Sequence, residues 1–127
     1  MYGYSKTTTV DFDKAVSKIR SELEKEGFGV LTEIDVKATL KKKLDVDFRK
    51  YVILGACNPP FAHRALSAEI DIGLLMPCNV IVYENEGGGS TVAAMNAGLM
   101  AEVTGNQELA SVADEVNDRL QRAVDAV

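Results

Sequence analysis

The segment YVILGACNPPFAHRALSAE, from Tyr51 to Glu69, carries the clearest strand and helix signals of this chain. Its first seven residues carry no charge and are apolar on both faces, which predicts an interior strand over residues 51–57. A helix follows at once, because asparagine is a favoured N-cap and proline suits the first helical position. Asn58 and Pro59 fill these two positions. We therefore expect the Asn58 side chain to accept a hydrogen bond from the backbone N–H of Phe61.

Further strands and helices are predicted on both sides of this segment. Apolar and β-prone runs predict strands over YSKTTTV (4–10), FGVLTEI (28–34), LLMPCNVIVYE (74–84) and STVAAMN (90–96), with helices between and after them. The order β-α-β-α-β-α-β-β-α predicts one two-layer α/β domain over residues 1–127, with its helices packed on one face of the sheet. We expect a mixed sheet, since the last two strands form a hairpin and the helical crossovers favour parallel pairs.

Charge and hydropathy exclude several classes of function. The chain of 127 residues has a formal net charge of −5, whereas nucleic-acid binding requires a basic footprint. Six basic residues nevertheless cluster locally, and such clusters are usually solvated surfaces; they are Lys37, Lys41, Lys42, Lys43, Arg49 and Lys50. No run approaches the ~20 apolar residues of a membrane span, and the first residues lack the apolar core of a signal peptide. We expect a cytoplasmic protein with no membrane or nucleic-acid partner and with reduced thiols.

Both cysteines of the chain are followed by asparagine and lie close to a proline. Cys57 stands between a predicted strand and a helix N-terminus, where the helix dipole favours a thiolate. Asn79, next to Cys78, lies within a run that otherwise indicates a buried strand. A buried amide without partners costs about 1–3 kcal/mol, so Asn79 serves either a structural hydrogen bond or a ligand. The plain structural interpretation of the other motif is a helix cap beside a small buried thiol.

The direction of the two strands decides whether the motifs meet. Cys57 ends one predicted strand, and Cys78 opens the main part of the next. If these strands are antiparallel neighbours, the two thiols lie at the same end of the sheet. If they are parallel, the thiols lie roughly 20 Å apart, because six residues rise ~3.3 Å each. The sequence leaves both arrangements open.

Two further side chains are weaker candidates for a ligand site. Glu33 ends a predicted strand and can act as a base if it points into a cleft, although a solvated carboxylate is the commoner outcome. His63 is the single histidine and flanks the apolar stripe of its helix. The spacing Cys-x₅-His with a distant second cysteine matches no strong metal signature, so we assign no metal ligand and no particular cofactor.

The motifs CNPPFAHRAL and LLMPCNVIVYE, with FGVLTEIDV before them and TVAAMN after them, resemble the small prokaryotic family named domain of unknown function 302. The resemblance covers nearly the whole chain, and both Cys-Asn motifs occur in the expected order. It implies a compact two-layer α/β fold and self-association as a homodimer. It implies no reaction, cofactor or catalytic residue.

Three hypotheses of function follow. The first is a binding domain that holds a small ligand or metal in a polar pocket built from both Cys-Asn motifs; its candidate residues are Cys57, Asn58, Cys78, Asn79, Glu33 and His63. The second is a thiol-dependent redox or transfer enzyme, with Cys57 as nucleophile and Cys78 as resolving thiol. The third is a structural module that dimerises through an apolar sheet face.

Overall fold

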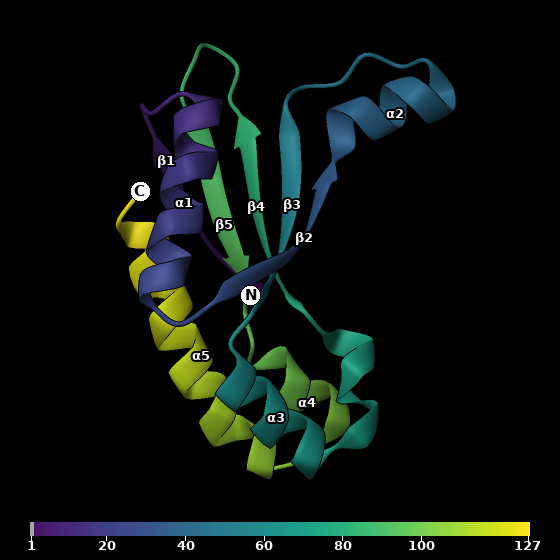
Figure 1. Ribbon diagram of the computed structural model, residues 1–127, viewed down its shortest axis with the longest axis vertical. Coiled ribbons are helices and arrows are strands. Elements are labelled where there is room, and N and C mark those ends of the chain that lie inside the picture. Colours follow the sequence, from purple (N-terminus) through teal and green to yellow (C-terminus); the bar gives the residue numbers. More distant parts are fainter. Residues whose placement is uncertain (1) are drawn as a thin grey trace.

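The computed structural model describes residues 2–127 as a five-stranded sheet with helices on one face and at both ends (Figure 1). In chain order the elements are β1 (Gly3–Thr8), α1 (Phe12–Lys25), β2 (Gly29–Asp35), α2 (Val36–Leu44), β3 (Tyr51–Cys57), α3 (Pro59–Ala68), the 3₁₀ helix η1 (Ile70–Leu75), β4 (Cys78–Glu84), β5 (Ser90–Met95), α4 (Leu99–Thr104) and α5 (Glu108–Asp125). The expected two-layer α/β architecture is confirmed. None of the helices in residues 2–127 is long and apolar enough to cross a membrane.

The strand order is β1-β5-β4-β3-β2, and all four neighbouring pairs are antiparallel. The expectation of a mixed sheet with parallel pairs is therefore wrong. The reason is that two of the supposed crossover helices do not cross the sheet. α2 extends beyond one end of β2 and β3, while α3 and η1 lie beyond the other end, so the chain returns in the opposite direction (Figure 1). Of the three predicted crossover helices, only α1 crosses the sheet, since it joins the two edge strands β1 and β2.

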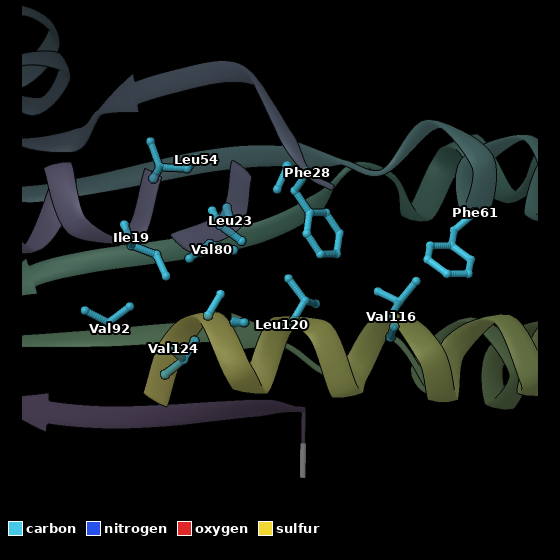
Figure 2. Close-up of a cluster of buried hydrophobic side chains, with 14 of the residues drawn as sticks. Ile19, Leu23, Phe28, Leu54, Phe61, Val80, Val92, Val116, Leu120 and Val124 are labelled. Atoms are coloured by element: carbon cyan, nitrogen blue, oxygen red, sulfur yellow. The ribbon is translucent and has the colours of Figure 1, made fainter. Parts of the chain in front are cut away.

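One face of the sheet carries the main core. α1 and α5 pack on it side by side, and the buried residues of β3, β4 and β5 that face these helices meet them there (Figure 2). The central contacts come from fully buried aliphatic side chains: Ile19, Leu23, Leu54, Val80, Val92, Leu120 and Val124. The expectation that all helices pack on one face is wrong, because α2, α3 and α4 lie at the ends of the sheet (Figure 1).

Local sequence signals place the ends of these elements. The carboxylates of Asp11 and Asp35 each accept a hydrogen bond of 2.9 Å from a backbone N–H in the first helical turn, as N-caps of α1 and α2. Gly27 ends α1 with φ +88°, a conformation that favours glycine. These signals act over a few residues, so they are independent of the direction in which the strands pair.

Candidate functional site

The two cysteines lie at the same end of the sheet. β3 ends at Cys57 and β4 begins at Cys78, and these strands are antiparallel neighbours. Cys78 pairs with Ala56, the residue directly before Cys57. Strand spacing and rise per residue place the two cysteine Cα atoms about 6 Å apart. Of the two arrangements left open by the sequence, the structure contains the one in which the thiols meet.

Both cysteines border a small cavity of about 30 Å³ between the strand ends and helices α3, α4 and α5. Its lining is apolar and rich in sulfur: Phe28, Ala56, Cys57, Asn58, Phe61, Ala62, Ala65, Met76, Cys78, Met100, Val112 and Val116. Pockets for metabolites usually measure ~300–1,000 Å³. This cavity has room for an atom-sized guest such as an ion or a water molecule.

Burial changes the acidity of one thiol. Removal from water raises the pKa of Cys78 to about 11, and the neighbouring Cys57 thiol adds to the increase. Burial acts in this direction because it disfavours the charged thiolate. Cys78 is therefore a neutral thiol near pH 7 and a poor nucleophile in the free protein.

Asn58 lies at the cavity wall but does not cap α3 with its side chain. The expected hydrogen bond from Phe61 is therefore wrong. The side chain is 7% exposed, and its Nδ2 donates to the carbonyl oxygen of Glu26 at 3.2 Å. Arg119 on α5 donates to the same oxygen at 3.1 Å. Asn58 thus joins the end of α1 to α3 and α5. If Asn58 capped α3 instead, the Glu26 carbonyl oxygen would lose one of its two side-chain donors.

The carboxylate of Glu26 strengthens this junction. It accepts a hydrogen bond of 2.8 Å from the guanidinium of Arg122, and this bond lowers the pKa of Glu26. Desolvation opposes the shift, while the positive charges of Arg122 and Arg119 add to it. The end of α1 is thereby tied to α5 by two arginines. The wall of the cavity is fixed by this junction.

The remaining candidates lie away from the cavity. Asn79 is exposed, because it points to the face of the sheet that α1 and α5 leave uncovered, opposite Gly55. The expectation of a buried Asn79 is wrong, since period-two alternation places the side chains of Cys78 and Asn79 on opposite faces. Glu33 is exposed on β2 and pairs with Arg20 at 3.2 Å. His63 is exposed on α3.

The cavity-lining side chains that sequence reasoning missed include Met76, Met100 and Phe61. Met76 directly precedes the Pro77-Cys78 pair, so its position in the motif was a usable signal. Met100 comes from α4, and only the packing of that helix brings it to the cysteines. Phe61 forms part of the wall, and the guanidinium groups of Arg64 and Arg119 lie 5.7 Å and 5.3 Å from its ring centre.

The side chains available to a metal ion are therefore sulfur donors. Within the part of the chain that the structure describes, no three His, Cys, Asp or Glu side chains come close enough to hold a metal together. The cavity offers two thiols and two thioethers instead, from Cys57, Cys78, Met76 and Met100. A bound metal at this place requires an ion that accepts soft ligands in small number.

The fold and the paired thiols define a class of small α/β domain with a fully antiparallel five-stranded sheet and a cysteine-lined cavity at one end. Residues 4–127 match the family described as Domain of unknown function DUF302, and the chain belongs to this family. It is similar to a solved protein from Bacillus stearothermophilus described as an uncharacterized conserved protein DUF302. The identity is 27% over 99% of this chain and 98% of the other, with a TM-score of 0.91. A comparison with curated proteins finds no match.

Proposed function

We propose that this domain binds one soft monovalent metal ion, of the class of Cu(I), in the cavity between Cys57 and Cys78. The observation that carries the proposal is the lining of the cavity. It contains both cysteines of the chain and two of its four methionines. This concentration of sulfur in one apolar cavity exceeds what the filling of a core requires, since aliphatic side chains fill such space equally well.

The donor set favours Cu(I) over zinc. Thiolates and thioethers are the ligands that select Cu(I), whereas structural zinc is held by four Cys, His or carboxylate donors. Glu33 and His63, which zinc would require, lie on the surface outside the cavity. The volume of about 30 Å³ accommodates an ion without a hydration shell, and the lining is almost entirely apolar.

Binding would be coupled to protonation. One cation replaces the protons of both thiols, and the site then carries a net charge of −1. Because the pKa of Cys78 is about 11, its proton competes with the metal at neutral pH. The dissociation constant should therefore fall by up to about 100-fold for each pH unit while both thiols are protonated. A reducing cytoplasm, where thiols stay free, suits both the ion and the site. The expected homodimer is compatible with this role.

Anaerobic titration with Cu(I) against a chromophoric competitor tests the proposal. We expect one ion for each chain and a loss of binding in Cys57→Ser and in Cys78→Ser. Met100→Leu, which keeps the volume of the side chain, should weaken binding about tenfold or more. Met95→Leu is the matched control, because Met95 lies outside the cavity lining. Binding that survives both cysteine substitutions would refute the proposed site.

A second candidate is thiol–disulfide exchange, which is favoured by the position of Cys57. This side chain is partly exposed next to Cys78. Its thiolate would attack a disulfide of a partner protein, and Cys78 would then close a Cys57–Cys78 bond and release two partner thiols. Reaction with a thiol reagent at neutral pH separates the candidates. Fast modification of Cys57 and rapid formation of the internal bond would favour exchange over metal binding.

A further inference from the structure

One face of the sheet is left uncovered by the chain. Alternation along the strands turns one set of side chains toward α1 and α5 and the other set away from them. In register, Ile34, Ile53, Ile81 and Ala93 form a row across β2, β3, β4 and β5 on the outward side. Tyr51 and Tyr83 form the neighbouring row, with their rings stacked at 5.4 Å. We call this surface the open face.

The composition of the open face is unusual for a solvent-exposed sheet. Charged residues make up 26% of the chain. The outward positions of the five described strands nevertheless include no Asp, Glu, Lys or Arg. The exposed side of an antiparallel sheet is normally polar. Aromatic residues without charges are typical of the centre of a protein–protein interface.

A neighbouring segment also lacks a partner. From Leu31 to Lys50 the structure contains no buried residue. This segment, which we call the arm, holds most of β2 and all of α2, and α2 projects beyond the sheet (Figure 1). Its exposed apolar side chains include Leu44, Val46 and Phe48. The ring of Phe48 lies 6.2 Å from that of Tyr51, so the apolar surface of the arm adjoins the open face.

We infer that the open face and the arm together form the interface with a second copy of this chain. An uncharged surface can face its own copy across a two-fold axis without bringing like charges together. The charges of the arm and of the rest of the chain, which lie outside the open face, have opposite signs. Residues 36–50 of the arm contain six basic and two acidic side chains, a net charge of +4. The other residues carry a net charge of −9, which gives the chain its total of −5. Each basic arm can therefore meet the acidic body of its partner.

The area supports a contribution from both surfaces. Five strands spaced ~4.8 Å apart and ~20 Å long give the open face an area on the order of 450 Å². A stable interface buries about 800 Å² on each partner. The open face alone is too small, and the arm supplies the remainder. Pairing through the free edge of β2 is disfavoured, because the register shifts between Val30 and Thr32, and such bulges disrupt edge pairing.

Sedimentation equilibrium of the full chain tests this inference. We expect wild type to be a dimer and Ile81→Lys to raise the dimer dissociation constant by about 100-fold or more, because a lysine from each copy enters the centre of the interface. Leu74→Lys is the matched control. Leu74 is an equally apolar residue on η1, 87% exposed and outside the open face, and its replacement should leave the dimer unchanged.

Two further variants test the interface on the arm and its independence from the proposed metal site. If Ile81→Lys does not fold, Phe48→Ser on the arm should weaken the dimer, because its side chain is already exposed. Cys57→Ser should remain dimeric, and this separates the inference from the proposed metal site. A monomeric wild type would overturn the inference, as would a dimer that survives both Ile81→Lys and Phe48→Ser. A monomer that binds phosphatidylserine vesicles through the open face would equally overturn it.

Discussion

Asn58 shows how one side chain can serve a different purpose from the one its position indicates. It occupies the N-cap position of α3, yet its amide donates to the Glu26 carbonyl at the end of α1. Arg119 shares this acceptor from α5. Three segments that are distant in the sequence therefore meet at one oxygen atom beside the cavity.

We expect Asn58→Ala to lower the free energy of unfolding by about 1–2 kcal/mol, because a mostly buried hydrogen bond is lost and the Glu26 carbonyl keeps only Arg119. His63→Ala is the control. His63 is exposed on α3, outside the open face and the arm, and surface substitutions usually change stability by less than about 0.5 kcal/mol. Urea unfolding measures both. Equal effects of the two substitutions would contradict the role assigned to Asn58.

The thiol of Cys78 should make stability depend on alkaline pH. Its pKa in the folded protein is about 11, whereas an unfolded thiol titrates near ~8.5. The unfolded state therefore loses its proton first. The contribution to stability is complete below pH ~8.5 and is lost as the pH rises to about 11, with a size of roughly 3 kcal/mol. Below pH ~8 the thiol should cause no change.

Thermal unfolding of wild type and Cys78→Ala between pH 8 and 11 measures this contribution. Tyrosines and lysines titrate in the same range, so the difference between the two proteins is the informative quantity. We expect that difference to shrink as the pH rises. Two parallel curves would show that Cys78 is not buried as a neutral thiol.

At the scale of the element, β2 and β3 approach each other closely at Gly55. A side chain at this position would contact Thr32 of β2 and would lie 2.8 Å from Cγ of Pro77. Both neighbours stand on the open face, and glycine is the residue that leaves them room. The close approach holds Pro77, and with it the start of β4 at Cys78, against the end of β3.

Gly55→Ala should destabilise the protein by about 1–3 kcal/mol, because the added methyl group forces Thr32 and Pro77 apart. Gly29→Ala is the control on the adjacent strand, since a methyl group there meets nothing within 4 Å. Urea unfolding of both variants provides the comparison. If alanine is tolerated equally at the two positions, the close approach at Gly55 does not constrain the sheet.

Helices α1 and α2 have the same start signal but different packing. Each begins with an aspartate whose carboxylate caps the first turn. α1 buries Ala15, Ile19 and Leu23 against the sheet, whereas α2 buries no residue. A helix of nine residues is marginal by itself. The different packing of these two helices is the element-scale reason to expect a partner for the arm.

At the scale of the whole molecule, charge is distributed unevenly. Residues 36–50 of the arm carry a net charge of +4 in a chain of −5. A patch of this size is small for nucleic acid, which contacts several phosphates over a wide basic surface. The acidic remainder of the molecule would also repel the phosphate backbone.

We therefore expect no tight binding of DNA or RNA in a mobility-shift assay at ~50 mM salt, a condition that favours electrostatic binding. The charge-reversed variant Lys42→Glu, on the exposed arm, should behave like wild type. Tight binding that weakens with salt and is lost in Lys42→Glu would show that the arm is a nucleic-acid site after all.

The strands, the helix starts and the end of α1 follow from the sequence alone, because they depend on residues only a few positions apart. Asp11, Asp35 and Gly27 act within one turn, and the apolar runs of β3 and β4 identify them as strands whatever their partners are. The sequence also singled out Cys57 and Cys78 as a pair. These properties follow from local backbone and side-chain chemistry.

The direction of the strands, and with it the site, depends on tertiary packing. α3 packs on α5 beyond the sheet instead of crossing it, so β4 returns antiparallel to β3 and the two thiols meet. The same packing brings Met100 to them and turns Asn79 to the open face. These outcomes depend on contacts between residues far apart in the chain, and the free energy of burying their apolar surfaces, which selects among them, is not a property of any single segment.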